Sequence, residues 1–289
     1  MQKVRIRLPA IASGFGSLFN GSGLALSLHA SFEISFRQDD EIIVDAYGEG
    51  AGRYPTGLRH PTVVGMSRMF QILEYAPQGF HVRVSNEIPF DAGLGAETIA
   101  MVAGMAAANY LSPQPLDRKA LVELIGQNIS HPELGITSLL GGLTNVAATL
   151  DRVFTRTYKI ENYRVIIAVP LHEQAYSPPA LPERLPSQEA LNNIQRLPIL
   201  IDALRTGDMR DAEQLLRDAL LDPYYKEHIP GYEHVLEIAR LAGAYGIGVS
   251  GGGPALVIFG GRNIDRIAEA IEVAYDNLGI NTWVRVASV

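Results

Sequence analysis

A glycine-bearing loop is the segment of this sequence best suited to binding an anion. It runs Pro89-Phe90-Asp91-Ala92-Gly93-Leu94-Gly95-Ala96-Glu97-Thr98, between a strand-like stretch and a helix-like run of small residues. Glycines let the backbone turn and approach a ligand, and the free amides of a helix's first turn lie at the positive end of its dipole. Phosphate is the ligand that such a junction favours. A Gly-x-Gly turn also packs a helix tightly on a sheet, and the loop alone leaves that alternative open.

Two further glycine segments flank this loop in the sequence. Pro9–Leu26 precedes it, and Gly246–Ala255 follows it and contains Ser250-Gly251-Gly252-Gly253. In this order the three segments resemble the three signature motifs of the GHMP small-molecule kinases, and within that superfamily those of the homoserine kinases. Further matches cover nearly the whole chain: His131-Pro132, Leu139-Leu140-Gly141-Gly142, Asn193-Ile194-Gln195-Arg196, Asp222-Pro223-Tyr224 and Ile229-Pro230-Gly231.

The resemblance implies a phosphotransferase that moves the γ-phosphoryl group of ATP, with Mg²⁺, to a hydroxyl of a small metabolite. Phosphoryl transfer asks a protein mainly to position the reactants and to stabilise charge, through amides around the phosphates and oxygen ligands for the metal. The resemblance assigns nucleotide binding to two backbone segments. Their residues are Gly93, Leu94, Gly95, Ala96, Glu97, Thr98, Ser250, Gly251, Gly252 and Gly253.

The metal ligands that the resemblance implies are altered in this sequence. Ala96 and Glu97 replace serines of the family's second motif, and the glutamate expected two residues before the His-Pro pair is Ile129. Because Mg²⁺ prefers hard oxygen ligands, one hypothesis gives metal binding and catalysis to Glu97 and Thr98, with Glu133 as a further catalytic residue. The alternative is that metal binding is lost and Glu97 only stabilises a helix N-terminus.

The acceptor site has changed further. The residues assigned to it are Gly14, Asn20, His131, Asn193, Arg184, Tyr225 and Lys226. Gly14 and Asn20 replace an asparagine and an aspartate of the family, Glu133-Leu134 replaces Asp-Asn, Tyr225 replaces an arginine, and Arg184 is out of register with another. An amino-acid substrate carries fixed charges that need counter-charges, typically an arginine for the carboxylate. The predicted acceptor is therefore a metabolite other than homoserine.

The same changes keep two other functions open. One is a catalytically degenerate relative that keeps the fold as a binding or interaction module. The other is an enzyme that carries out non-kinase chemistry in the same cleft on a phosphorylated or apolar ligand. The first is motivated by the loss of the expected glutamate at Ile129 and of the serines at Ala96 and Glu97.

Composition limits the class of protein. The 289 residues are 47% hydrophobic and 19% charged, with a net charge of −7 and no basic run, which argues against a nucleic-acid partner. No apolar stretch approaches the roughly 20 residues of a membrane span. Cysteine is absent, which excludes disulfides and thiolate chemistry and fits a cytoplasmic location. The expected partner is a small-molecule substrate, and a homodimer stays open.

The periodicity predicts an α+β protein. Strands are expected at 4–8, 31–36 and 41–46 as parts of an antiparallel sheet, then at 80–85, 162–170, 248–249, 255–259 and 282–287. Helices are expected at 60–76, 98–111, 116–128, 188–205, 209–221, 233–244 and 264–278, and a loop through 131–142. The resemblance implies an N-terminal domain (1–158) like the second domain of ribosomal protein S5 and a ferredoxin-like C-terminal domain (159–289), with the ligand cleft between them.

Overall fold

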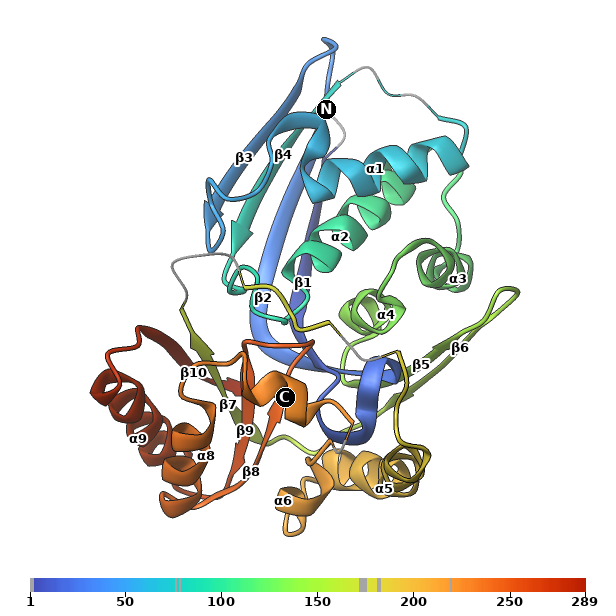
Figure 1. Cartoon of the computed structure of the whole chain (residues 1–289). Coiled ribbons are helices and arrows are strands. Elements are labelled where there is room, and N and C mark those ends of the chain that lie inside the picture. The colour runs from blue at the N-terminus through green and yellow to red at the C-terminus, as the bar shows by residue number, and fades with distance from the viewer. Residues whose placement is uncertain (1–2, 76, 78, 172–175, 181–182, 219) are drawn as a thin grey trace.

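The computed structural model describes residues 3–75, 77, 79–171, 176–180, 183–218 and 220–289. Two sheets, each flanked by helices, follow one another along the chain (Figure 1). The first has the strand order β3-β4-β2-β5-β6, with β1 paired to β2. Its strands are β1 (Lys3–Ser13), β2 (Ser22–Arg37), β3 (Ile42–Gly48), β4 (Gly79–Asn86), β5 (Leu143–Ala148) and β6 (Val153–Tyr158).

The pairing of β3 corrects the antiparallel expectation. β3 runs parallel to β4, whereas the pairs β1·β2, β2·β4, β2·β5 and β5·β6 are antiparallel. The helix α1 (Pro61–Ile72) lies between β3 and β4 in the chain and carries it back to the end at which β3 started. Such a crossover makes the next strand parallel. The hairpin of β5 and β6 had no sequence prediction.

Two helices approach each other backbone to backbone over the first sheet. They are α1 and α2 (Ala96–Leu111), which lie side by side in Figure 1. A Cβ added to Gly65 would lie 2.0 Å from the carbonyl oxygen of Met101, and one added to Gly104 would lie 1.9 Å from that of Thr62. Only glycine fits at both crossings. The small residues of α2 therefore allow the close packing predicted for a buried central helix.

The segment 131–142, expected to be a loop, forms the helix α4 (Pro132–Leu140), which follows α3 (Arg118–Asn128). Pro132 occupies the first turn, where a missing amide costs no hydrogen bond. A Cβ on Gly135 would lie 2.2 Å from Cδ1 of Ile129, so this glycine lets the Ile129 side chain pack closely against the helix. Both residues look like helix breakers in the sequence and are compatible with the helix for these reasons.

The second sheet is antiparallel, with the order β10-β7-β9-β8. Its strands are β7 (Arg164–Pro170), β8 (Ala244–Val249), β9 (Leu256–Gly260) and β10 (Thr282–Ser288). Side chains alternate between its two faces: Val165 and Ile167 join the large core shared with the first sheet, whereas Ile166 and Ala168 join a second core. Both faces are buried, which explains the continuous apolar sequence of β7.

Helices cover this sheet and connect it to the first. They are α5 (Ser187–Thr206), α6 (Ala212–Leu215), α7 (Asp222–Lys226), α8 (Tyr232–Leu241) and α9 (Ile264–Asn277). The residues of α8 and α9 supply much of the second core. The helix predicted over 209–221 is confirmed only at α6 and is wrong on both sides of it. Oδ1 of Asp218 accepts hydrogen bonds from the amides of Leu220 and Leu221, and this local bonding competes with a continuing helix.

Two short 3-10 helices complete the fold, η1 (Gly16–Gly21) and η2 (Gly57–Arg59). Within the described ranges, no helix has both the length and the apolar character needed to cross a membrane. The first sheet ends at Tyr158 with β6, and the second begins at Arg164 with β7. The division of the chain at 158/159 stays a prediction.

Candidate functional site

Hydrogen bonds join the three glycine segments at one place in the structure. Oγ of Ser250 donates to the carbonyl oxygen of Gly93 (2.8 Å) and accepts from the amide of Ser13 (3.2 Å). The amide of Gly251 donates to the carbonyl of Ser13 at 2.8 Å, and that of Ala255 to the carbonyl of Ala92 at 3.0 Å. Segments far apart in the sequence thus form one rigid wall.

The wall requires glycine at two crossing points. Gly93 has φ +76° and Gly251 has φ +55°. A Cβ on Gly93 would lie 2.3 Å from the carbonyl oxygen of Ser250, and one on Gly251 would lie 2.5 Å from that of Gly93. Part of the glycine pattern therefore serves the packing of one loop on another.

The free amides at the start of α2 face the same space. Gly95 is the N-cap of this 16-residue helix, in a left-handed conformation (φ 79°), and it has no side chain with which to cap the helix. The amides of Ala96, Glu97 and Thr98 belong to the first turn, where no carbonyl of the helix can accept from them. Together with the helix dipole, they make this end of α2 a site for an anion.

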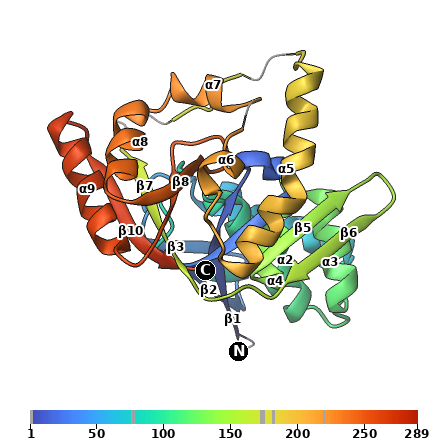
Figure 2. The same ribbon diagram turned by 90° about the horizontal axis from the view of Figure 1, so that it is seen from below.

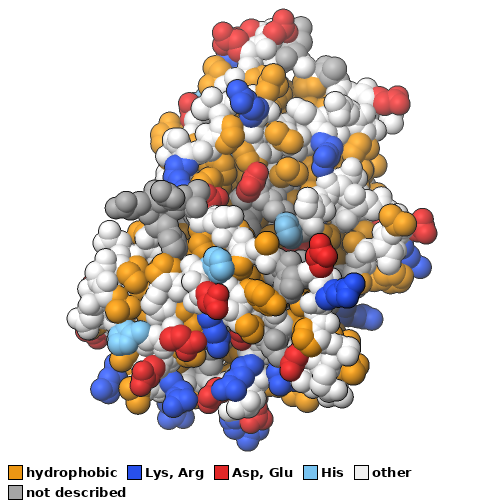
Figure 3. Space-filling model, in the orientation of Figure 1, with side chains coloured by type: hydrophobic (Ala, Val, Ile, Leu, Met, Phe, Trp, Pro, Cys, Tyr) orange, Lys and Arg blue, Asp and Glu red, His pale blue; other side chains and the backbone are white. Residues whose placement is uncertain are grey.

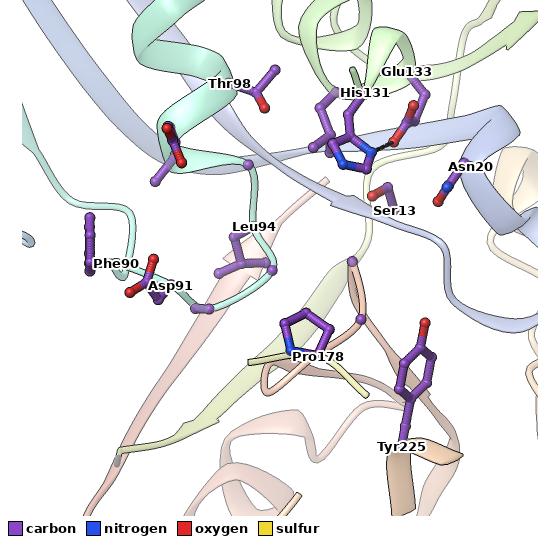
Figure 4. Close-up of a pocket in the computed structure, with 18 of the residues that line it drawn as sticks. Ser13, Asn20, Phe90, Asp91, Leu94, Thr98, His131, Glu133, Pro178 and Tyr225 are labelled. Carbon is purple, nitrogen blue, oxygen red and sulfur yellow. Dashed lines mark ion pairs between the residues drawn. The ribbon is translucent and has the colours of Figure 1, made fainter. Parts of the chain in front are cut away.

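These elements line a cleft of about 340 Å³. Figure 4 shows the glycine loop and α2 on one side, His131 and Glu133 on another, and Pro178 and Tyr225 below. Twelve of the residues predicted from the sequence line it: Asn20, Gly93, Leu94, Gly95, Ala96, Glu97, Thr98, His131, Glu133, Tyr225, Gly251 and Gly252. The lining of the cleft comes from both halves of the chain.

The other predicted residues lie outside this lining. Gly14, Ser250 and Gly253 belong to the wall behind it: a Cβ on Gly14 would lie 3.6 Å from the Gly251 amide nitrogen. Asn193 is buried and donates to Asp218 Oδ1 at 2.8 Å. Arg184 is exposed ahead of α5, and Nζ of Lys226 lies 3.7 Å from Oε1 of Glu233.

One end of the cleft is aromatic. The rings of Tyr54 and Phe90 meet edge to face, with centroids 4.7 Å apart, and the guanidinium of Arg53 lies 4.3 Å from the Phe90 centroid. Nη2 of Arg53 also lies 3.5 Å from Oδ2 of Asp91. Burial raises the pKa of the Tyr54 hydroxyl and that of the Asp91 carboxyl. This end offers ring faces and edges for a flat apolar group.

The opposite end is polar and is built on the start of α4. The side chain of Glu133 is only 1% exposed, and its Oε2 has no hydrogen-bond partner within the described structure. Its Oε1 lies 3.6 Å from Nδ1 of His131, the ion pair dashed in Figure 4. The Glu133 carboxylate raises the pKa of His131. An unsatisfied buried carboxylate oxygen is costly unless a ligand supplies a donor or a cation.

The lining of the cleft contains acidic side chains but no lysine or arginine among its described residues. The three carboxylates are those of Asp91, Glu97 and Glu133. A polyanion bound here must rely on the backbone amides and on a cation that accompanies it. The described residues contain no group of three or more His, Asp or Glu side chains arranged to hold a metal.

The oxygens present nonetheless suit Mg²⁺ that arrives with a nucleotide. Such ions are held by one or two carboxylates together with substrate phosphates, rather than by a complete protein cage. Glu97 and Thr98 lie in the first turn of α2, and the unpartnered Oε2 of Glu133 lies at the start of α4. All three are hard oxygen donors within the lining of one cleft.

Several lining residues have no role predicted from the sequence. These are Ser13, Tyr54, Phe90, Asp91, Ala92, Leu134, Pro178 and Pro179. Phe90 and Asp91 lay within the quoted loop but received no role. For Tyr54 the available signal was the preceding glycine run: a Cβ on Gly50 would lie 2.9 Å from both the Tyr54 and the Phe90 ring.

Comparison with known families identifies the fold. Residues 62–151 match the GHMP kinases N terminal domain, and residues 200–277 match the GHMP kinases C terminal domain. The chain belongs to the GHMP kinase superfamily. Homoserine kinase from Parasynechococcus marenigrum is 30% identical over 96% of this chain and 91% of the relative. That from Carboxydothermus hydrogenoformans is 28% identical over the same shares of the two chains.

Solved structures agree on the fold. A homoserine kinase from Cytophaga hutchinsonii has a TM-score of 0.84 at 20% identity and covers 100% of this chain and 95% of its own. A putative homoserine kinase from Listeria monocytogenes has a TM-score of 0.79 at 23% identity, with 100% and 96% covered. The expected two-domain α+β fold is therefore confirmed, and this GHMP kinase is homoserine kinase-like.

Proposed function

We propose that this chain is an ATP- and Mg²⁺-dependent kinase that phosphorylates a hydroxyl of a small metabolite lacking a carboxylate, and therefore not homoserine. The observation that carries the kinase assignment is the first turn of α2. Its free amides line a cleft whose wall is fixed by the bonds of Ser250 to Ser13 and Gly93. This is the arrangement that receives phosphate groups at a helix N-terminus.

The two ends of the cleft give the substrates different places. The triphosphate lies over the loop of Gly93 to Gly95, and the nucleobase lies toward Tyr54 and Phe90, where aromatic surface is available. The acceptor lies toward Asn20, Glu133 and His131. The reacting hydroxyl and the γ-phosphoryl group are thereby held in one enclosed space, which is the main requirement of phosphoryl transfer.

Glu97 and Thr98 are the residues that hold Mg²⁺ beside the triphosphate. When bound, the ion neutralises charge on the phosphate oxygens that the acidic lining would otherwise repel. Glu133 orients the acceptor: its unpartnered Oε2 accepts a hydrogen bond from the hydroxyl. It takes the hydroxyl proton as the oxygen bonds to the γ-phosphorus and ADP leaves. Nδ1 of His131 lies 3.6 Å from Oε1 of the same carboxylate, which raises the pKa of this imidazole.

The chemical class of the acceptor is inferred from the absence of lysine and arginine among the described residues that line the cleft. A carboxylate-bearing acceptor would lie beside Glu133 with no lysine or arginine in the described lining to receive it. Loss of a charge-assisted hydrogen bond costs about 1.5 to 3 kcal/mol, so losing several reduces affinity by orders of magnitude. Neutral polyols and amino alcohols fit the polar end better.

The decisive experiment measures ADP formation with a panel of acceptors that includes homoserine, sugars, polyols and amino alcohols. We expect turnover with a neutral or amine-bearing hydroxyl compound and a fall in kcat of about 100-fold in Glu133→Gln. Phosphorylation of homoserine at an ordinary rate, with a KM at or below the millimolar range, would show that the acceptor assignment is wrong. Absence of ATP binding in calorimetry with Mg²⁺ would overturn the kinase assignment itself.

A second candidate function, a non-catalytic binding module, is favoured by one observation. Ile129, which stands where the family's glutamate is expected, is committed to packing, because a Cβ on Gly135 would meet its Cδ1 at 2.2 Å. That position supplies no metal ligand. Nucleotide binding without any ADP formation across the panel would favour this function over the kinase.

A further inference from the structure

A second pocket lies in the C-terminal half of the chain and shares no lining residue with the glycine cleft. Its volume is about 450 Å³, and residues of α5, α6, α7, α8 and β8 line it. Figure 2 shows α6, α7 and α8 in this part of the molecule. In Figure 3 lysine and arginine side chains gather on the lower part of the face, mixed with acidic ones.

Four basic side chains belong to the lining: Arg196, Arg217, Lys226 and Arg240. Nη2 of Arg217 and Nη1 of Arg240 each lie 3.6 Å from the same Oε1 of Glu213, and both side chains are more than half exposed. These separations exceed hydrogen-bond distance. One carboxylate thus faces two guanidinium groups, which leaves the rim with positive charge and with donors for an anionic group.

A buried carboxyl group also lines the pocket. Asp218 is 2% exposed, and its Oδ1 accepts three hydrogen bonds, from Nδ2 of Asn193 and from the amides of Leu220 and Leu221. Its Oδ2 accepts none within the described structure. Asp222, whose Oδ2 accepts from the Asp218 amide at 2.9 Å, lines the same pocket. Two carboxyl groups therefore line the pocket, and a hydrogen-bond donor of a ligand would satisfy the unpartnered Oδ2 of Asp218.

We propose that this pocket is an effector site for a small amino-acid zwitterion. The ammonium group meets Asp218 and Asp222, and the carboxylate meets Arg217 and Arg240. The two aspartates would repel a simple anion bound in this pocket, and the basic rim would repel a simple cation. A ligand that carries both charges therefore suits the pocket better than either. Leu236 and Ile247 supply apolar surface for its side chain.

The pocket also accounts for sequence matches that the glycine cleft does not use. Asn193 and Arg196 came from one matched segment, and Asp222 and Pro223 from another. Arg196, Asp222 and Pro223 line the second pocket, while the amide of Asn193 holds Asp218. Lys226, assigned to the acceptor by sequence, lines it as well.

The helix α7 connects the two cavities. Asp222, Pro223 and Lys226 line the second pocket, whereas Tyr225, from the same five-residue helix, lines the glycine cleft. The Tyr225 hydroxyl is 3.8 Å from where a Cβ on Gly252 would lie. Because residues of this one short helix line both cavities, effector binding is expected to change the affinity of the cleft for its own ligands. This coupling, unlike the binding, rests on the proposed function.

Calorimetry of the full chain with the standard L-amino acids, one at a time, tests the binding. We expect at least one to bind, and we expect the double variant Arg217→Gln/Arg240→Gln to weaken it about tenfold or more. Arg210→Gln is the matched control: Arg210 is an 86% exposed arginine that pairs with Asp208, outside the pocket lining. It should leave the affinity unchanged, as should Glu133→Gln in the glycine cleft.

Three results would overturn the site: no amino acid binds at millimolar concentration, the double variant binds as well as the parent, or Glu133→Gln abolishes binding. The last would place the ligand in the glycine cleft. For the coupling, ATP with Mg²⁺ is titrated with and without the bound amino acid, and each ligand must change the other's affinity by the same factor. Equal ATP affinities would show that α7 does not couple the cavities. Failure of ADP formation would contradict the kinase but leave the amino-acid titration readable.

Discussion

The hydroxyl of Ser250 donates a hydrogen bond of 2.8 Å to the carbonyl of Gly93, and this bond joins two loops that lie 157 positions apart in the sequence. The same oxygen accepts from the amide of Ser13. Ser250 is 0% exposed, so water does not compete for these partners. One side chain therefore fixes the glycine loop relative to the strand β1 and the C-terminal sheet.

Removing this hydroxyl should loosen the cleft wall. Ser250→Ala leaves a buried amide at Ser13 and a partly buried carbonyl at Gly93 without this partner, which costs about 1 to 3 kcal/mol of unfolding free energy. Urea unfolding followed by circular dichroism measures the change. Ser85→Ala, at an exposed position on β4, should stay within about 0.5 kcal/mol of the parent. Equal stabilities of the two variants would contradict the role of Ser250.

Two glycines of the loop should respond differently to alanine. A Cβ on Gly93 would lie 2.3 Å from the Ser250 carbonyl, whereas one on Gly95 finds only ordinary contacts at 3.4 Å. Both have positive φ, which costs about 1 to 2 kcal/mol for alanine. We expect Gly95→Ala to fold with that loss alone and Gly93→Ala to lose clearly more, as measured by thermal unfolding. A Gly93→Ala variant as stable as Gly95→Ala would show that the wall is looser than this packing implies.

The parts of the fold that could be predicted are those specified by residues contiguous in the sequence. The glycine loop and α2 were predicted because their turn residues and small side chains are contiguous. Glu133, which stands beside the His-Pro pair in the sequence, lines the cleft, and its catalytic role stays a prediction. The helix α4 was missed because Pro132 and Gly135 look like breakers unless the packing partner Ile129 is known. The end of α6 depends on the side-chain bonds of Asp218, which periodicity does not show.

Tertiary contacts decided the rest of the site. Tyr54 and Phe90 form the aromatic end only because the loop after β3 folds against the glycine loop. Lys226 and Tyr225 are neighbours in sequence, yet α7 directs them to different cavities. The spacing of residues in the sequence identified members of both pockets, but it could not show which residue belongs to which pocket.

Glu97 should control the requirement for Mg²⁺. In the structure Gly95 is the N-cap of α2, and Glu97 is exposed in the first turn. Glu97→Ala should therefore raise the Mg²⁺ concentration for half-maximal turnover about tenfold or more, while the loss of its interaction with the helix dipole costs at most about 1 kcal/mol. Glu97→Gln keeps the shape and removes the charge, so it should behave as Glu97→Ala does. Turnover with unchanged Mg²⁺ dependence would show that Glu97 is only a helix-terminus residue.

The carboxyl of Asp222 should make the protein less stable as the pH rises. Burial raises its pKa from 3.8 to about 6, with the nearby Asp218 charge acting in the same direction. Between about pH 4 and pH 6 the folded state binds more protons than the unfolded state, so the free energy of unfolding falls as the pH increases through this range. The loss reaches at most about 3 kcal/mol above pH 6.

Asp222→Asn removes this titration while its amide oxygen still accepts from the Asp218 amide. We expect the variant to be more stable than the parent at pH 8 and to lose that advantage near pH 4. His60, whose pKa burial lowers to about 4, produces the opposite trend in both proteins, so the parent and the variant are compared at each pH. Urea unfolding at a series of pH values gives the difference. A difference that does not change with pH would show that the Asp222 carboxyl titrates near its ordinary value.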